Sequence, residues 1–428
     1  MVLMQRKWWI CGLLLCASTI NYMDRMTLAS VARRLIEEFS LSKAQYGMIE
    51  QYFGYAFAVG AIVFGLIVDR VSARWLYPVV LLLWSAAGML TGLAGIAGFG
   101  SAFSSLLLFR TMLGFFESGH WPCALQTTQR LLEPKDRALG NSVLQSGVSL
   151  GAIVTPVIVG AMLTPAAGSW RLPFLIIGGI GVLWVVAWIF ATRGVNFAVE
   201  RQVVREPLGR SLGQILRDRR FWILVFVVSA INGPWGIFRV WLPLVFQDPR
   251  GLAFTEAETL GRILPGYYIM TDLGCLAAGA GTVWLHARGA SVLNSRRIVF
   301  TICALLVMLA MFVPALSRGE LTIPGLSARV AAIGAMMLVA AGSLGVFPCF
   351  YAFSQELSQH RIGLVTGLTG FFAWITSSSL QRPLGAHVDR TGSYDIAFLA
   401  GAWPCIVAAA LLWLFWERKP AENSPSLP

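Results

Sequence analysis

The sequence predicts an all-α membrane protein of twelve transmembrane helices, arranged as two six-helix bundles. Hydrophobic residues make up 57% of the 428 residues and charged residues only 13%, whereas soluble chains usually carry about 25% charge. Apolar stretches of about 20 residues recur along the chain, which is the length that crosses roughly 30 Å of hydrocarbon. A soluble protein could not bury this much apolar surface, so lipid must supply part of the chain's surroundings.

The expected spans form two sets of six, separated by the longest polar stretch. The spans are 8–31, 46–68, 76–97, 103–130, 140–163 and 172–192, then 221–247, 262–285, 297–316, 328–355, 363–386 and 394–416. The polar stretch, 193–220, is rich in arginine and contains almost nothing apolar. We therefore expect one bundle over 1–192, a cytoplasmic linker over 193–220, and a second bundle with a short cytoplasmic tail over 221–428.

The distribution of positive charge predicts the orientation. The formal net charge is +12, and with the N-terminus inside, the inner segments hold about 20 Lys and Arg against about nine outside. Both termini are therefore expected in the cytoplasm, in a multi-pass protein of the cell inner membrane. The first apolar stretch has no cleavage-like site, so we interpret it as a retained span.

Several functional classes lack support in the sequence. No basic tract carries interleaved aromatic residues on a soluble module, so nucleic acid is not an expected partner. The seven cysteines lie in apolar stretches without a C-x-x-C pair, and the four histidines are not spaced for a metal. The spans offer no nucleophile–base pair. We therefore expect no enzyme activity, no cofactor and no metal site.

A few charged or titratable residues fall inside the expected spans, where charge is costly and usually functional. The alternative is that some lie near helix ends and extend to the interface, or pair with each other structurally. They are Asp24, Arg25, Arg110, Glu117, His120, Arg239, Asp272 and Arg382.

Four of these residues have the chemistry of a proton-coupled anion carrier. Asp24 and Arg25 are neighbours, and successive helical residues point about 100° apart, so they can face different partners. Arg110 and Glu117 are seven residues apart and share one helix face, which Gly114 keeps thin. A carboxylate in a low-dielectric cavity can take up and release a proton near neutral pH. An arginine keeps its charge and suits an anion.

Three of the other four residues have two interpretations each. His120 lies on the same face as Glu117 and is a candidate substrate ligand, but helix–helix hydrogen bonding explains it equally well. Arg239 is a second candidate for the substrate, or extends to the outer interface. Asp272 is a further possible proton site, or a buried partner of Arg239. Arg382 is interpreted mainly as part of an outer-surface cluster.

Two segments resemble signatures of the major facilitator superfamily. Residues 65–74, GLIVDRVSAR, are similar to its G-x-x-x-D-R-x-G-x-R/K loop, with Ser72 in place of the usual Gly, and residues 110–114, RTMLG, are similar to its fourth-helix R-x-x-x-G motif. The resemblance implies the superfamily fold. It also implies a cytoplasmic charge network that holds the outward-facing state, formed here by Asp69, Arg70 and Arg74.

A narrower resemblance, to the anion:cation symporter family of sugar-acid carriers, covers nearly the whole chain. It is carried by the segments 21–25 (NYMDR), 115–119 (FFESG), 133–137 (EPKDR) and 170–174 (WRLPF), with Pro122. It implies that Arg25 contacts the substrate carboxylate, with Tyr22 beside it. It also implies that Asp24 and Glu117 take up protons, and that Arg110 pairs with Asp24 or organises the pocket.

Some positions depart from that family. Val148 aligns with a fifth-helix Gln, although Gln145 lies three residues earlier, and Phe371 aligns with an eleventh-helix Asn. His120 and Trp121 follow the Glu at positions that vary in the family. These departures leave the coupling residues in place, so a sugar acid is expected without a specific identity.

The expected function is proton-coupled symport of an organic anion such as a hexuronate, aldonate or aldarate by alternating access. The anion binds at Arg25, with help from Tyr22, Gln51, Tyr52, His120 and Arg239. The expected partners are this anion, protons and the bilayer, and the chain is expected to act as a monomer. The alternatives are an antiporter of organic anions or organophosphates, and a non-transporting membrane sensor of the same fold.

Overall fold

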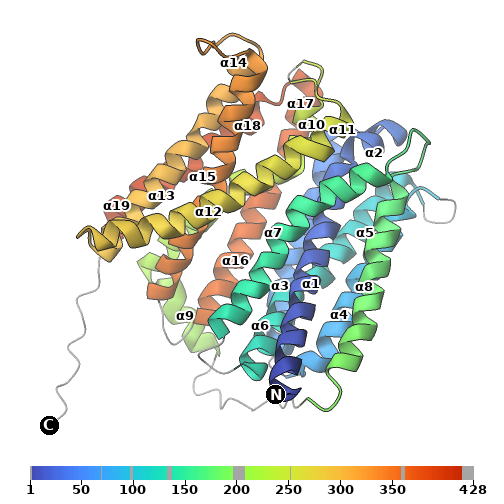
Figure 1. Cartoon of the computed structure of the whole chain (residues 1–428), viewed down its shortest axis with the longest axis vertical. Coiled ribbons are helices and arrows are strands. Elements are labelled where there is room, and N and C mark those ends of the chain that lie inside the picture. The colour runs from blue at the N-terminus through green and yellow to red at the C-terminus, as the bar shows by residue number, and fades with distance from the viewer. Residues whose placement is uncertain are drawn as a thin grey trace.

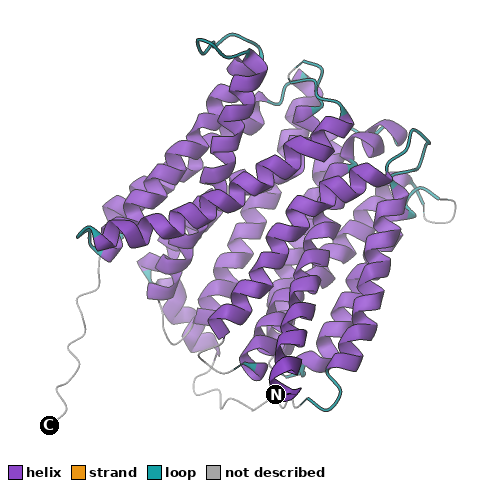
Figure 2. Cartoon of the chain, viewed as in Figure 1, coloured by secondary structure: helices purple, strands orange, loops and turns teal. Residues whose placement is uncertain are grey.

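A computed structural model of the chain describes residues 2–68, 70–96, 100–132, 137–195, 208–250, 252–357 and 362–416. Within these ranges every regular element is a helix (Figures 1 and 2). The all-helical fold that the composition predicts is therefore confirmed.

The helices before the linker follow the first six expected spans. They are α1 (Val2–Ser30), α2 (Ala32–Glu38), α3 (Lys43–Val68), α4 (Ala73–Gly92), α5 (Ala102–Glu117), α6 (His120–Leu131), α7 (Arg137–Met162) and α8 (Arg171–Ala191). The fourth span is two helices, because the chain turns at Ser118 and Gly119. The short helix α2 after the first span was not expected.

The remaining helices follow the second six expected spans. They are α9 (Leu208–Arg217), α10 (Arg219–Phe246), α11 (Glu256–Glu258), the π-helical η1 (Thr259–Ile263), α12 (Leu264–Ala287), α13 (Val292–Met308), the 3₁₀-helical η2 (Leu309–Phe312), α14 (Val313–Ser317), α15 (Ala328–Leu357), α16 (Ile362–Ser379), α17 (Gln381–Thr391), α18 (Asp395–Ala402) and α19 (Pro404–Phe415). Helix α9 lies inside the expected linker and packs on α10.

Nine of the helical segments in the described residues are long and apolar enough to cross a membrane by themselves. The other three expected spans are α1, α5 with α6, and α16 with α17. Helix α1 carries Asn21, Asp24 and Arg25, which lower its apolar character, and the other two spans are interrupted by turns. The spans that fall short are therefore those that carry polar groups or breaks.

The helices pack as two groups, and we call α1 to α8 the first group and α10 to α19 the second. In the first group α1 packs on α7, α3 on α5, and α4 on α8, whereas in the second α12 and α13 pack on α15 and α10 packs on α16. Helix α3 contacts α16 and α17 across the groups, and α7 contacts α12. The domain limits 1–192 and 221–428 stay predictions.

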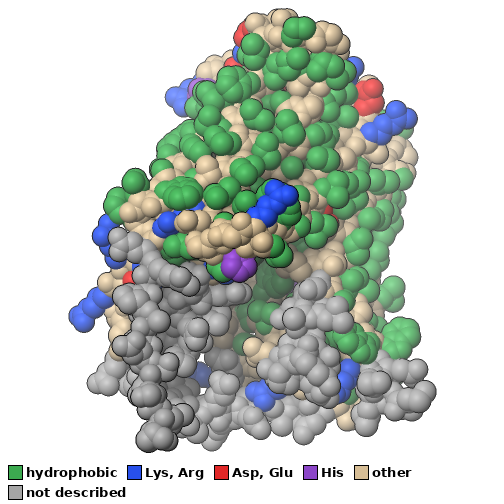
Figure 3. Space-filling view, turned by 60° about the vertical axis from the view of Figure 1, so that its left-hand side comes forward, with side chains coloured by type: hydrophobic (Ala, Val, Ile, Leu, Met, Phe, Trp, Pro, Cys, Tyr) green, Lys and Arg blue, Asp and Glu red, His purple; other side chains and the backbone are tan. Residues whose placement is uncertain are grey.

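The two ends of the molecule are distinct (Figure 1). The N-terminus, the end of α8 and helix α9 lie at one end, here named the linker end, which is the lower one in the figure. Helices α2, α11 and α14 lie at the other, the far end. On the face shown in Figure 3, hydrophobic side chains cover much of the described surface between the ends, as lipid contact requires.

Helices α3 and α17 approach each other closely at the far end because glycines face backbone there. A Cβ at Gly47 would lie 2.3 Å from the carbonyl oxygen of Gln381, and one at Gly385 would lie 2.1 Å from that of Lys43. The Asp389 carboxylate accepts hydrogen bonds from the backbone amides of Lys43 (2.7 Å) and Ala44 (2.8 Å). A residue of the second group thus caps the first turn of α3.

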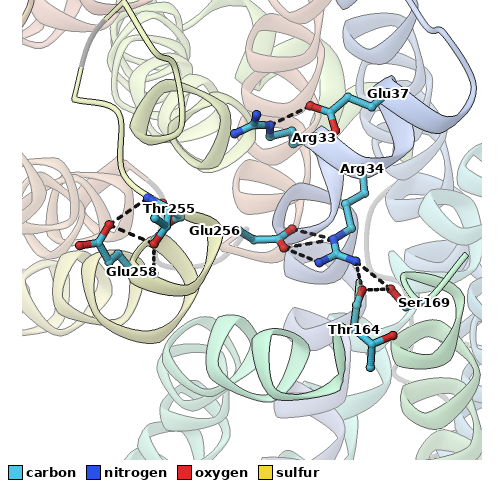
Figure 4. Close-up of polar contacts among 9 residues, drawn as sticks. Arg33, Arg34, Glu37, Thr164, Ser169, Thr255, Glu256 and Glu258 are labelled. Carbon is cyan, nitrogen blue, oxygen red and sulfur yellow. Dashed lines mark hydrogen bonds and ion pairs between the residues drawn. The ribbon is translucent and has the colours of Figure 1, made fainter. Parts of the chain in front are cut away.

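An ion pair between α2 and α11 also joins the groups at the far end (Figure 4). Arg34 Nη2 lies 2.5 Å from Glu256 Oε2, and Arg34 Nε donates to the same carboxylate. Arg34 Nη1 donates to the carbonyl oxygen of Thr164 and to Ser169 Oγ, between α7 and α8. One arginine therefore holds three segments together.

Candidate functional site

The first part of the candidate site is a buried ion pair between α1 and α5. Arg25 Nε donates to Glu117 Oε1 at 2.5 Å, and the two side chains are 5% and 0% exposed. Asn21 Nδ2 donates to the Glu117 carbonyl oxygen at 3.5 Å. The Arg25 guanidinium is thus held against the end of α5.

Aromatic rings surround the Arg25 guanidinium. The Arg25 Cζ atom lies 5.2 Å from the ring centroid of Tyr22, 5.9 Å from Phe53, 4.7 Å from Phe57 and 5.1 Å from Trp374. Each distance permits a cation–π contact. Trp374 comes from α16, so the second group covers a cation of the first. The sequence contains no charge signal that would have revealed Trp374.

Asp24 points away from this pair, as the helical angle between neighbours allows. A Cβ at Gly88 of α4 would lie 3.0 Å from Asp24 Oδ1, so the carboxylate faces a thin part of α4. Asp24 is 1% exposed, and neither of its carboxylate oxygens has a hydrogen-bond partner among the described residues. A buried carboxylate without a hydrogen-bond partner is a site where a proton, a water molecule or a ligand can bind.

Glu50 on α3 forms the second part of the site and was missed in the sequence. Its Oε1 accepts from Arg110 Nη2 at 3.0 Å and its Oε2 from Arg239 Nη2 at 2.9 Å, with Glu50 and Arg110 fully buried. Glu50 lies within the expected span 46–68, so the cost of charge in a span applied to it as well.

The ion pairs differ from two of the pairings that we considered. Arg110 Nη1 donates to the backbone carbonyl of Asp24 at 3.3 Å, and the carboxylate that Arg110 binds belongs to Glu50. Arg239 also binds Glu50, whereas Asp272 accepts a hydrogen bond from Ser149 Oγ at 2.6 Å. Asp272 thereby connects α12 to α7.

Three arginines and three carboxylates form one buried group, which we call the cluster: Arg25, Arg110, Arg239, Asp24, Glu50 and Glu117. Their formal charges balance, and several of their buried polar atoms have no hydrogen-bond partner. Among the described residues, the buried atoms of the cluster without a hydrogen-bond partner are Asp24 Oδ1 and Oδ2, Arg25 Nη2, Glu117 Oε2, Arg110 Nε and Arg239 Nη1. Buried polar atoms are normally satisfied by protein, water or ligand. The arrangement has both the donors to bind an anion and the acceptors to bind protons.

His120 is held inside the first group. Its Nε2 lies 3.0 Å from Ser18 Oγ and its Nδ1 lies 2.7 Å from the Tyr77 hydroxyl. Both ring nitrogens are thus engaged, and the side chain is fully buried. Of the two interpretations of His120, this geometry favours hydrogen bonding between helices.

The two polar residues after Glu50 lie on different sides of α3. Gln51 Nε2 donates to the Tyr55 hydroxyl at 2.7 Å, and that hydroxyl is 2.8 Å from Ser379 Oγ of α16. Tyr52 is 42% exposed and its ring packs against Tyr55. Gln51 therefore lies near the second group, whereas Tyr52 faces outward.

The remaining predicted residues lie away from the cluster. Arg382 is exposed on α17 at the far end. Of the charge network between α3 and α4, Asp69 lies outside the described residues, Arg70 is exposed, and Arg74 is half-buried beside the ring of Trp75. The structure thus brings Asp24, Arg25, Glu117, Arg110 and Arg239 together and places the loop motif at the linker end.

The chain is similar to known sugar-acid transporters. It is 25% identical to the hexuronate transporter of Escherichia coli K12 over 435 residues, covering 97% of this chain and 95% of that one. It is 27% identical to the hexuronate transporter of Bacillus subtilis, covering 97% and 96%. It is 24% identical to the galacturonate transporter of Dickeya chrysanthemi, covering 71% and 89%. The resemblance to the anion:cation symporters is thereby confirmed.

Solved structures confirm the fold. The D-xylose–proton symporter superposes with a TM-score of 0.73 at 14% identity, covering 95% of this chain and 97% of that one. A bacterial Spinster homologue, inward-facing and unoccupied, gives 0.72 at 16% identity with 95% of both chains covered. The family model described as Major Facilitator Superfamily matches residues 14–381. The chain therefore belongs to the major facilitator superfamily of membrane transporters.

Proposed function

We propose that the chain couples inward proton movement to uptake of an organic anion, and that a sugar acid is the substrate. The observation that carries the proposal is the buried cluster of three arginines and three carboxylates at the junction of two helix groups, with unused donors and acceptors in it. The names of the similar transporters support hexuronates as the first substrates to test.

The substrate carboxylate binds Arg25 in this proposal. The unused Nη2 of Arg25 offers a charge-assisted donor, and Tyr22 lies against the same guanidinium. Arg239 supplies a donor from the second group. Gln51, Tyr52 and His120 stay proposed helpers, and of these Gln51 has an unused side-chain oxygen, Oε1.

Asp24 and Glu117 carry the protons in this proposal. Protonation of Asp24 breaks no hydrogen bond of its carboxylate, and protonation of Glu117 at Oε2 leaves the Arg25 bond at Oε1 in place. Each proton taken up leaves one arginine charge without a balancing carboxylate. An anion is then the group that restores neutrality, so proton and anion binding favour each other.

Transport proceeds by alternating access, in which the two helix groups rock around the cluster. The contacts of α3 with α17 and of Arg34 with Glu256 close the far end in this conformation. In this proposal the protein lies in the cell inner membrane with both termini in the cytoplasm. The linker end then faces the cytoplasm and the far end faces outward. Arg70 and Arg74, with Asp69, form the gating network at the cytoplasmic side. The protein works as a monomer.

The test is uptake of radiolabelled D-glucuronate into proteoliposomes that contain the purified protein. We expect accumulation with an inward proton gradient and no substrate inside, and its collapse when a protonophore is added. Uptake that needs an internal anion instead would identify an antiporter. Substrate binding without flux would identify a sensor.

A further inference from the structure

Glu50 is the buried residue through which the two helix groups share a charge. Its bond to Arg110 stays within the first group, because α3 and α5 both belong to it. Its bond to Arg239 crosses to α10 of the second group. The two carboxylate oxygens therefore serve different groups, one oxygen each.

This bond lies where the groups are most tightly packed. Gly47 and Gly54, one turn before and after Glu50, lie against the backbone of Gln381 and the side chain of Ser378. The Tyr46 hydroxyl, on the same helix, donates to the carbonyl oxygen of Val240, next to Arg239. Separation of α3 from α10 and α17 must therefore break the Glu50–Arg239 bond.

We propose that Glu50 is a positioning residue that holds the far end closed by binding Arg239 whenever no substrate anion does so. We call the Glu50–Arg239 ion pair the latch. The inference rests on the proposed function, since this ion pair has a role in closure only if the two groups move relative to each other. Glu50 is an internal competitor of the substrate for Arg239, which is the one cation that the described residues of the second group contribute to the cluster.

The two carboxylate oxygens of Glu50 allow Arg239 to exchange Glu50 for a substrate carboxylate. When the far end opens, Glu50 keeps Arg110, so its charge stays compensated within the first group. Arg239 loses its only anionic partner among the described residues and has a second nitrogen, Nη1, already without an acceptor. An incoming carboxylate then satisfies Arg239. When the carboxylate leaves, Glu50 recovers Arg239 and the far end closes.

The experiment measures the width of the far end directly. Spin labels are attached to cysteines introduced at Ala166, between α7 and α8, and at Ile323, between α14 and α15, which are both exposed. The accessible native cysteines, Cys16 and Cys275, are replaced by alanine. Distances are recorded by pulsed electron resonance on the full-length protein in detergent without substrate.

We expect Glu50→Gln and Arg239→Gln each to raise the population of the longer distance roughly tenfold, because each removes the ion pair between the groups. Arg239→Lys keeps one charged donor for the single bond and should retain the short distance. Glu320→Gln is the matched control, because Glu320 pairs with Arg318 within the second group. It should leave the distances unchanged.

Unchanged distances in a folded Arg239→Gln protein would overturn the proposal. This variant leaves Glu50 compensated by Arg110, so it serves as the decisive one if Glu50→Gln fails to fold. A longer distance in Arg239→Lys equal to that of Arg239→Gln would also overturn it, because a positive charge retained opposite Glu50 would then fail to keep the far end closed.

The distance measurement separates this inference from the transport proposal. It is made without substrate or a gradient, so the measured distances alone decide whether the Glu50–Arg239 pair closes the far end. If the variants open the far end but no sugar acid is taken up by wild-type proteoliposomes, the transport proposal fails, and the Glu50–Arg239 pair still closes the far end in the absence of substrate. If uptake occurs and the distances do not change, only the latch fails.

Discussion

The three carboxylates of the cluster differ in how many of their oxygens accept a hydrogen bond. Glu50 uses both carboxylate oxygens, Glu117 uses one, and Asp24 uses neither. Removal of one partner from a buried ion pair typically costs ~3–5 kcal/mol, because the other charge is left uncompensated. Single substitutions in this cluster are therefore expected to cost stability, and a charge-balanced double variant is the appropriate control for folding.

Glu117→Gln should abolish proton-driven uptake while substrate exchange persists. The amide keeps an oxygen for Arg25 but cannot take up a proton, so coupling is lost and the site remains. The measurement compares D-glucuronate uptake under a pH gradient with exchange between equal internal and external D-glucuronate. Normal gradient-driven uptake by this variant would show that Glu117 is not a coupling residue.

Arg25→Ala should lose affinity for the anion, by at least about tenfold, since a hydrogen bond to a charged group is worth ~1.5–3 kcal/mol. D-glucuronate binding is measured by calorimetry on the detergent-solubilised protein. The double variant Arg25→Ala with Glu117→Gln removes the uncompensated carboxylate and is the control for folding. Retained affinity in either folded variant would exclude Arg25 as the carboxylate ligand.

At the scale of elements, α3 does most to connect the groups. It carries Glu50, packs against α16 and α17, and receives its first-turn cap from Asp389. Gly47 of α3 and Gly385 of α17 permit the two backbones to touch, whereas glycines such as Gly279 and Gly334 have nothing within 4 Å of an added Cβ. Gly47 and Gly385 should therefore be much less tolerant of substitution than the glycines that face open space.

Gly47→Ala should destabilise the protein by about 1–3 kcal/mol, because its Cβ would overlap the Gln381 carbonyl group and force the helices apart. The matched control is Gly334→Ala in α15, where nothing lies within 4 Å of the added Cβ. It should leave stability equal or raised by up to about 1 kcal/mol through helix propensity. Thermal unfolding in detergent measures both. Equal melting temperatures would contradict the close contact.

The sequence predicted the elements better than it predicted their contacts. Apolar stretches of membrane-spanning length determine the helices locally, so the order of the spans was recovered. Buried charge revealed Asp24, Arg25, Arg110 and Glu117 by the same physical cost. Trp374 escaped because an aromatic residue in a span is unremarkable until packing places it against a cation. The partners of Glu50 likewise depend on tertiary packing.

At the scale of the whole molecule, two kinds of ion pair join the groups toward the far end. The Glu50–Arg239 pair is buried, whereas Arg34 and Glu256 are about one-quarter exposed. Exposed ion pairs are typically worth ~0–1 kcal/mol and are weakened by salt. Closure should therefore have a salt-sensitive outer component and a salt-resistant inner one.

Arg34→Gln should widen the far end less than Glu50→Gln does, and added salt should widen the wild type toward the Arg34→Gln distance. The spin-label pair at the far end measures both at about 0.05 M and 0.5 M salt, where screening differs strongly. Glu37→Gln is the control, because its partner Arg33 lies on the same helix α2. If Arg34→Gln remains as salt-sensitive as the wild type, the ion pair is not the outer component.

The capping of α3 by Asp389 has a consequence for biosynthesis. Asp389 follows Lys43 by 346 residues, so the ribosome must make most of the chain before this acceptor exists. Until then the backbone amides of Lys43 and Ala44 depend on water for their hydrogen bonds. The next amide, that of Gln45, is already bound by Ser42 Oγ within the first group. Completion of the α3 cap therefore has to wait for the second group.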